Sequence, residues 1–371
     1  MSEAQPAPAP IPRLGCLSSL GLSLASIVGG GLAACTLVAA LAGAWTWVQL
    51  GLGGMACAGA AVLAIAGRRR RRLRAAAFVL VLFALLRLLV AAGPGTGPQR
   101  PEAPIRCLYA GSGEPGSTWF AGVPERETVL LGALVGLSPP ERRRHLDALT
   151  AVYQEVAREG LFARDASPLL ESWFADRGHC WLAVPEGPGP FPLVVFLHGN
   201  GGSFQFYAQL LAREATARGL AIVFPASGLG TYPPGSAEAL ATRTIEAVAA
   251  AAPIARGRMG VVGLSAGAPA AFRAAVAEPG RFRVVASVSG VAPRLGPERL
   301  EALRDVRVLI LHGGADPRTA VGPIERVEAA LRAGGVSVAA RIDPDADHLA
   351  LLERRAEWVP WLLDHLAESL R

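Results

Sequence analysis

Ser265 is the residue whose setting most clearly predicts chemistry. It is the centre of the pentapeptide Gly263–Gly267 (G-L-S-A-G), which follows an apolar run over 259–264 and precedes a helical pattern. A serine hydroxyl becomes a nucleophile only when a base accepts its proton, and that base needs an acid to hold its tautomer. Asp316 and His348 follow in the order that such an elbow uses, each in a loop after a predicted strand. We therefore expect a triad of these three residues.

The small residues around the expected nucleophile fit a sharp bend between a strand and a helix. A serine at such a bend adopts strained dihedrals, and flanking side chains would collide where strand and helix draw close. Gly263 and Gly267 avoid that collision, and Ala266 is small as well. Pro269 falls in the first turn of the following helix, where its missing N–H does no harm.

Other acids and histidines compete for the two partner roles. Three more acids lie just before His348 and could orient it or be solvated: Asp343, Asp345 and Asp347. Asp316 is preferred because its position suits the expected chain order. Among the histidines, we expect His312 to form structural hydrogen bonds and His198 to shape a loop beside the nucleophile. The others are expected at the surface or in packing: His145, His179 and His365.

A further part of the site must stabilise the negative charge that develops on the substrate oxygen. The segment His198–Gly202 (H-G-N-G-G) follows the first well-marked strand and offers backbone N–H groups with little obstruction. One donor is expected to be the N–H of Ala266, aided by the positive end of its helix. The other is expected from Asn200 or its neighbour Gly201, and the sequence leaves that choice open. This chemistry requires no metal and no organic cofactor.

The elements that must position these residues begin at Trp181. From there, apolar runs alternate with amphipathic helical stretches, which predicts an α/β fold, a mostly parallel sheet flanked by helices. The expected strands are Pro192–Leu197, Leu220–Phe224, Met259–Leu264, Val284–Val288, Val306–Leu311 and Val336–Ile342. The expected helices lie near Phe206–Arg218, Ala237–Ala251, Ala266–Ala277, Val321–Ala333 and Leu351–Leu370. Active residues of such sheets gather where the strands end.

These motifs resemble those of the alpha/beta-hydrolases over residues 180–371, about half of the chain. The elbow and the later segment Val285–Gly290 (V-A-S-V-S-G) look most like the polyhydroxybutyrate depolymerase and feruloyl esterase branch, with dienelactone hydrolases close to it. The resemblance implies the alpha/beta-hydrolase fold and ester hydrolysis through an acyl-enzyme, with Ser265, Asp316 and His348 as the triad. The first hundred residues have no counterpart in secreted depolymerases, which argues against a polymeric substrate.

The N-terminal region predicts an all-α transmembrane segment of two to three helices. No charged residue occurs from Leu14 to Gly67, a stretch of 54 residues that is long enough for two spans of about 20 residues each. A third apolar run, Ala75–Ala92, carries one charge at Arg87, whose long side chain can extend toward the headgroups. The expected membrane region is 1–92, with spans at about 17–43, 48–66 and 75–92.

A cluster of arginines predicts the orientation of these spans. Basic loops stay on the cytoplasmic side, so Arg68–Arg74 predicts an N-terminus inside and, with three spans, an extracytoplasmic catalytic domain at a bacterial inner membrane. In the alternative, Arg87 prevents insertion of the third run, which leaves an interfacial helix and a cytoplasmic enzyme. A signal peptide fits less well, since its apolar region would be only about 7–15 residues long.

Residues 93–104 are rich in Gly and Pro and predict a linker from the membrane region to the globular domain. That domain, 105–371, is expected to have its core at about 180–371, preceded by a helical extension. Within the extension, Ser138 opens a helical pattern that runs to about Glu159, with a glutamate three residues after the serine as in a capping box.

Two cysteines lie outside the apolar runs, Cys107 and Cys180. An oxidising exterior would permit a disulfide between them. Two unrelated buried thiols fit the sequence equally well, so both interpretations stay open.

Charge argues against nucleic acid as a partner. The net charge of +6 arises from residues 1–100, which hold nine Arg and one acidic residue, whereas the rest of the chain holds 27 Arg and 29 acidic residues. The expected protein is thus a membrane-anchored serine hydrolase that acts on a small-molecule or lipid ester. The alternatives are a serine peptidase or acyltransferase, which use the same acyl-enzyme, and a non-catalytic binding protein on the same scaffold.

Overall fold

The computed structural model describes residues 103–109, 125–126, 129, 139–162 and 178–371, except 229, 231 and 294. All of these residues belong to one compact unit, Gly95–Arg371. The predicted membrane spans, and all but the last two residues of the predicted linker, lie outside the described residues. Among the helices that the structure describes, none is both long and apolar enough to cross a membrane.

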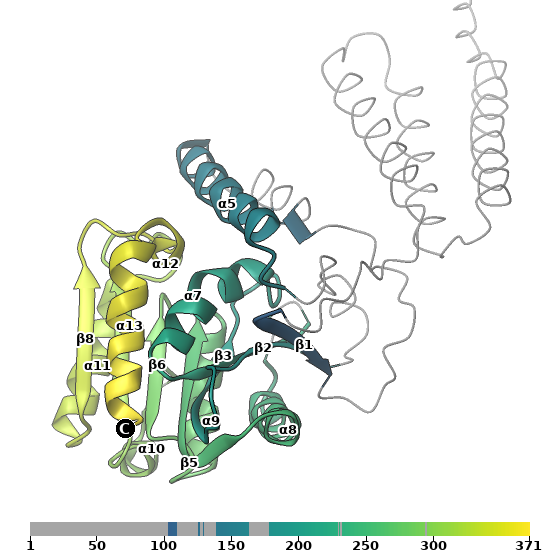
Figure 1. Ribbon diagram of the computed structural model, residues 1–371. Helices are drawn as coiled ribbons and strands as arrows, with labels where there is room; N and C mark the ends of the chain where they lie inside the picture. The colour runs from purple at the N-terminus through teal and green to yellow at the C-terminus, as the bar shows by residue number, and fades with distance from the viewer. Residues whose placement is uncertain are drawn as a thin grey trace, which may run out of the picture. The chain divides into compact units, whose positions relative to one another are not determined.

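A single sheet of eight strands forms the centre of the described domain (Figure 1). Its strands are β1 (Ile105–Tyr109), β2 (His179–Ala183), β3 (Phe191–Leu197), β4 (Ala221–Pro225), β5 (Ile254–Leu264), β6 (Val284–Val288), β7 (Arg307–Gly313) and β8 (Val338–Asp343). They lie in the order β1-β2-β4-β3-β5-β6-β7-β8. Strand β2 runs antiparallel to both of its neighbours, and every other pair is parallel. The carboxyl ends of β3, β5, β7 and β8 therefore lie at one edge of the sheet.

Helices cover both faces of the sheet, which explains the continuous apolar runs of its inner strands. The helices are α5 (Pro139–Glu159), α7 (Gln205–Ala217), α8 (Ser236–Ala251), α9 (Gly267–Ala277), α10 (Pro297–Ala302), α11 (Val321–Ala333), α12 (Ala350–Glu353) and α13 (Arg355–Ser369). One hydrophobic core joins the sheet to α5, α7, α12 and α13, and a second core joins its other face to α8, α9, α10 and α11. The predicted α/β architecture is confirmed.

The predicted elements from 181 onward all occur, with two differences that have physical causes. Strand β5 begins at Ile254 rather than Met259, because its first five residues extend beyond the core: two are exposed, and none is buried. The final helix predicted near Leu351–Leu370 is two helices, since the backbone at Arg354 departs from helical geometry between α12 and α13.

The sheet also begins much earlier in the chain than position 180. Strand β1 pairs with β2 from Ile105↔Ala183 to Tyr109↔His179, so part of the segment expected as a helical extension belongs to the core sheet. Both strands are only five residues long, and their pairing joins segments far apart in sequence, which leaves no local pattern to detect. The helix expected up to Glu159 is present as α5.

The two cysteines of the described residues lie on neighbouring strands, and no disulfide joins them to each other. Cys107 lies opposite Trp181, whereas Cys180 lies opposite Leu108. Because successive residues of a strand point to opposite faces, this register sends the two thiols into different cores. The disulfide interpretation is therefore wrong for this fold, and burial raises the pKa of the Cys180 thiol.

Candidate active site

Ser265 occupies the bend between β5 and α9, with a φ of 51° in the left-handed region that side chains rarely adopt. Its N–H donates to the carbonyl oxygen of Val288 on the neighbouring strand at 2.8 Å, which holds the bend in place. A side chain at Gly267 would collide with the carbonyl oxygen of Leu197, and one at Gly263 would collide with the backbone of Gly267. The glycines of the pentapeptide thus allow a close approach that the bend requires.

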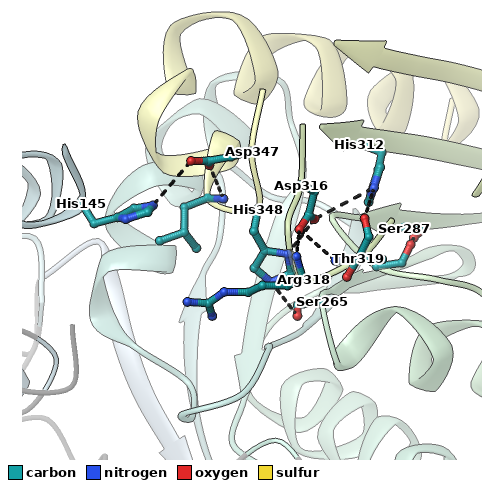
Figure 2. Close-up of polar contacts among 11 residues, drawn as sticks. His145, Ser265, Ser287, His312, Asp316, Arg318, Thr319, Asp347 and His348 are labelled. Carbon is teal, nitrogen blue, oxygen red and sulfur yellow. Dashed lines mark hydrogen bonds and ion pairs between the residues drawn. The ribbon is translucent and has the colours of Figure 1, made fainter. Parts of the chain in front are cut away.

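The structure brings Ser265, His348 and Asp316 together in one chain of hydrogen bonds (Figure 2). The Ser265 Oγ lies 2.9 Å from His348 Nε2, and His348 Nδ1 lies 2.7 Å from Asp316 Oδ2. A carboxylate can only accept, so Nδ1–H donates to Asp316 and Nε2 is left to accept the serine proton. The arrangement has the connectivity needed to activate a serine hydroxyl.

Asp316 is fixed by its own loop. Its Oδ1 accepts the backbone N–H groups of Arg318 at 2.8 Å and Thr319 at 2.9 Å, and its side chain is fully buried. The loop after β7 is joined to the loop after β8, because the Gly314 and Ala315 N–H groups donate to backbone carbonyls of the second loop. These backbone contacts help to keep the acid and the histidine in their relative positions.

The three competing acids near His348 have other settings. Asp343 binds the side chains of Arg341 and Trp358, and Asp345 is exposed. Asp347 accepts the Leu349 N–H and an Arg144 guanidinium N–H. Within the described part of the chain, no hydrogen bond joins any of these three carboxylates to the His348 ring.

His312, the second histidine beside Asp316, has a structural contact. Its Nε2 donates to the carbonyl oxygen of Thr319 at 2.9 Å, and the same nitrogen lies 4.0 Å from Asp316 Oδ2. Burial lowers the pKa of His312, so the ring is held in its neutral form. It supports the loop that carries Asp316.

The glycine-rich segment after β3 lies directly beside the nucleophile. A Cβ atom placed on Gly199 would be 3.2 Å from the Cβ of Ser265. Gly201 and Gly202 have φ values of 106° and 122°, which side chains rarely adopt. On the other side, Ala266 caps α9, and within the described residues its N–H makes no hydrogen bond. Both predicted sources of backbone donors thus adjoin Ser265.

His198 ties this segment to its neighbours. Its Nδ1–H donates to the carbonyl oxygen of Gly199 at 2.7 Å, and its Nε2 accepts the N–H of Ser227 at 2.9 Å. Tyr232 donates its hydroxyl to the His198 carbonyl oxygen. Burial lowers the pKa of His198 to about 4, which keeps the ring neutral and able to form both contacts. The other three histidines differ in burial, since His145 and His179 are buried and His365 is half-buried.

One supporting residue was missed by the sequence analysis. The buried carboxylate of Glu125 accepts the Tyr153 hydroxyl at 2.7 Å and the N–H of Gln205, the first residue of α7. This contact fixes the end of the loop that begins at His198 and stabilises the positive end of the helix. No local motif surrounds Glu125, so only the tertiary structure reveals it.

Comparisons with known proteins give one curated relative and several distant structures. No known protein-family profile matches the chain. "Putative esterase NocK" of Nocardia uniformis subsp. tsuyamanensis is 29% identical over an alignment of 200 residues, and the match covers 50% of this chain and 54% of that protein. The chain thus spans about half the length of that relative.

The similar solved structures include two that share low sequence identity with this chain. An acylaminoacyl peptidase of Pyrococcus horikoshii is 15% identical with a TM-score of 0.44, over 52% of this chain and 40% of that one. The 2,6-dihydroxy-pseudo-oxynicotine hydrolase is 20% identical with a TM-score of 0.43, over 66% of this chain and 80% of that one.

Proposed function

We propose that this chain, whose domain is an esterase-like serine hydrolase of the alpha/beta-hydrolase fold, cleaves carboxylic esters through an acyl-enzyme. The observation that carries the proposal is the hydrogen-bond chain of 2.9 Å and 2.7 Å from Ser265 through His348 to Asp316. The named esterase among its relatives supports the same reaction class.

The first step forms the acyl-enzyme. His348 Nε2 accepts the Ser265 proton as Oγ attacks the ester carbonyl carbon, and the buried Asp316 carboxylate stabilises the resulting imidazolium. The Ala266 N–H and a backbone N–H of Asn200 or Gly201 donate to the oxyanion. Such donors are typically worth about 3–4 kcal/mol each in a site that excludes water.

Departure of the alcohol completes the acyl-enzyme, and hydrolysis of the acyl-enzyme then uses the same groups. The His348 imidazolium gives its proton to the departing alkoxide, which leaves as an alcohol. His348 then accepts a proton from water as the water oxygen attacks the acyl carbon, and returns it to Ser265 as the acid departs. All proton transfers pass through one ring nitrogen, Nε2.

The proposal is tested with a fluorophosphonate probe and p-nitrophenyl esters on the full-length chain. Wild type is expected to release p-nitrophenol and to be labelled at Ser265, and Ser265→Ala is expected to lose both while keeping its far-ultraviolet circular dichroism spectrum. Turnover by the variant at the wild-type rate would refute the assignment. Added amine and alcohol acceptors separate hydrolysis from acyl transfer by their products, and an amide substrate tests peptidase activity.

The substrate is proposed to be a small-molecule or lipid ester rather than a polymer. The elbow and the Val285–Gly290 segment support placing the domain near the polyhydroxybutyrate depolymerase, feruloyl esterase and dienelactone hydrolase branch. The apolar N-terminal region, absent from secreted depolymerases, supports a substrate met at a membrane. A panel of p-nitrophenyl esters with acyl chains of increasing length tests this choice, and a preference for the polymer would overturn it.

We also propose that residues 1–92 anchor the enzyme in a bacterial inner membrane, with 93–104 as a linker and the catalytic domain outside the cytoplasm. The uncharged stretch of 54 residues from Leu14 and the arginine cluster that follows it support this topology. Reporter fusions at the C-terminus test it. A reporter active only in the cytoplasm would refute the orientation, and a chain extracted from membranes by carbonate would refute the anchor.

A further inference from the structure

A second polar cluster lies beside the candidate active site. His145 of α5, Asp347 of the loop after β8 and Glu353 of α12 each offer one ligand atom, and these atoms all lie within 4.8 Å of one another. His145 Nε2 is 3.5 Å from Glu353 Oε1 and 4.0 Å from Asp347 Oδ2. Figure 2 shows His145 facing Asp347, the residue directly before His348.

The cluster contains buried polar atoms without hydrogen bonds. Only 3% of His145 is exposed, and in the described part of the molecule neither ring nitrogen has a hydrogen-bond partner. The facing Oε1 of Glu353 is buried and also lacks one. Leaving such groups unsatisfied typically costs about 1–3 kcal/mol each, so a ligand between them would remove a large penalty.

We propose that His145, Asp347 and Glu353 bind one divalent transition-metal ion of the Zn²⁺ type. One imidazole nitrogen with two carboxylate oxygens is a donor set for Zn²⁺, with metal–ligand distances of about 2.0–2.2 Å. Ligands of a tetrahedral ion at such distances lie about 3.4 Å apart, so the 3.5 Å and 4.0 Å separations need only small shifts of side chains. A water molecule would complete the coordination.

The donor atoms of the cluster favour a Zn²⁺-type ion over Ca²⁺ or Mg²⁺. Ca²⁺ and Mg²⁺ prefer six or more oxygen ligands, whereas this cluster offers three ligand atoms, one of which is a nitrogen. The Asp347 and Glu353 carboxylates offer oxygen atoms within 4.8 Å of each other, and their side chains are only 11% and 19% exposed. The Arg144 guanidinium lies 3.2 Å from Asp347 Oδ2, and its side chain is 59% exposed.

A bound ion would connect α5 to two neighbouring segments that lie far from it in the sequence. It would join α5 to α12 and to the loop that carries His348. Asp347 already accepts the Leu349 N–H at 2.9 Å, so holding its other oxygen would stiffen both sides of His348. The ion would act as a brace for the candidate base and takes no part in the reaction, so Ser265→Ala is expected to keep the site.

The test is titration of the EDTA-treated full-length chain with Zn²⁺, followed by calorimetry and thermal unfolding. Wild type is expected to bind one equivalent with a rise in Tm, and Ca²⁺ is expected to cause none. His145→Gln and Glu353→Gln are expected to bind at least ~100-fold more weakly, since even outer partners of metal ligands contribute about 10–100-fold. His365→Gln removes a half-buried histidine elsewhere and is the matched control, which should bind as wild type does.

Three results would overturn the site. The first is a wild-type Tm that Zn²⁺ does not raise. The second is a His145→Gln variant that binds as tightly as the His365→Gln control. The third is a loss of stability in His145→Gln that is equal with EDTA and with Zn²⁺, because that result assigns the cluster to a histidine–glutamate ion pair. None of these results bears on the esterase proposal, since each is read without substrate.

Discussion

Two serines in this domain share an unusual backbone conformation and differ in everything else. Ser265 follows β5 with a φ of 51°, and Ser289 follows the neighbouring strand β6 with a φ of 48°. Ser265 is half-buried with its hydroxyl 2.9 Å from His348, whereas Ser289 is fully buried and its hydroxyl has no partner among the described residues. Both serines therefore share the strained backbone. What distinguishes Ser265 as the candidate nucleophile is its hydrogen bond to His348 and its access to solvent.

Two histidines near Asp316, His348 and His312, show a similar difference between a residue placed for catalysis and one with a structural contact. His348 lies in the loop after β8, between the Ser265 hydroxyl and the Asp316 carboxylate. His312, near the end of β7, is also close to Asp316, but its Nε2 donates to the Thr319 carbonyl oxygen. A nitrogen that donates to a carbonyl cannot accept a serine proton. Proximity to the acid is thus insufficient, since the ring must also present an acceptor to the nucleophile.

The largest expected effect separates the two serines. Ser265→Ala should lower kcat/KM for p-nitrophenyl esters by about 10⁵–10⁶-fold, the range expected when a triad nucleophile is removed. Ser289→Ala should stay within about threefold of wild type, because among the described residues the Ser289 hydroxyl forms no hydrogen bond with any member of the triad. A comparable loss in both variants would show that the turn after β6 takes part in the chemistry.

The histidine pair gives the second prediction. His348→Gln should reduce kcat by about 10⁵–10⁶-fold, since glutamine cannot accept and return the proton. His312→Gln keeps a donor for the Thr319 carbonyl oxygen and should cost about tenfold or less. Single-turnover kinetics with a p-nitrophenyl ester measure both acylation rates. Equal losses would mean that His312, not only His348, contacts the reacting atoms.

The acids give a smaller effect. Asp316→Asn should lower kcat by about 10³–10⁴-fold, because an amide in this position favours the wrong histidine tautomer while the geometry persists. Asp343→Asn is the matched control, since its carboxylate binds Arg341 and Trp358 rather than the triad, and kcat should change by less than about threefold. An Asp343 variant slower than the Asp316 variant would reassign the orienting acid.

These candidate residues could be predicted from sequence because their signals are local. The elbow combines Gly263, Ser265 and Gly267 within five residues, directly after an apolar strand. Asp316 and His348 follow strands whose apolar runs are unambiguous, since strands buried on both faces contain few polar residues. The parallel sheet was predictable for the same reason.

The remaining features depend on contacts between distant segments. Strands β1 and β2 are short, and only their pairing with each other and with β4 gives them a place in the sheet. The role of Glu125 depends on its contact with the start of α7, and that of His145 depends on two carboxylates, Asp347 in the loop after β8 and Glu353 in α12. A pattern of residue types cannot report such contacts, because burial of a polar side chain is decided by tertiary packing.

A fourth prediction concerns the histidines that stay neutral through burial. Burial lowers the pKa of His198 to about 4 and that of His179 to about 3, below the usual 6.5. Below about pH 6.5 the two histidines bind protons in the unfolded chain but stay neutral in the folded chain. Their contribution to the free energy of unfolding is therefore complete above about pH 6.5, and it is lost as the pH falls toward their folded-state pKa values.

At pH 5, His198 alone should lower the free energy of unfolding by about 2 kcal/mol relative to pH 7. Urea denaturation at both pH values measures this difference. In His198→Asn, which is expected to be less stable at pH 7, the difference should shrink by a similar amount. An unchanged pH dependence in that variant would show that other groups cause the acid sensitivity.

The smallest effect returns to the turn after β6. Ser287 and Ser289 are both buried, but the Ser287 hydroxyl donates to the Gly290 carbonyl oxygen at 2.9 Å, whereas that of Ser289 has no hydrogen-bond partner in the described part of the chain. Ser289→Ala should therefore raise the free energy of unfolding by about 1 kcal/mol, and Ser287→Ala should lower it by about as much. Thermal unfolding of both variants provides the comparison. A stability loss in Ser289→Ala equal to that in Ser287→Ala would mean that the second hydroxyl is satisfied in solution, and the distinction between the two strained serines would then rest on His348 alone.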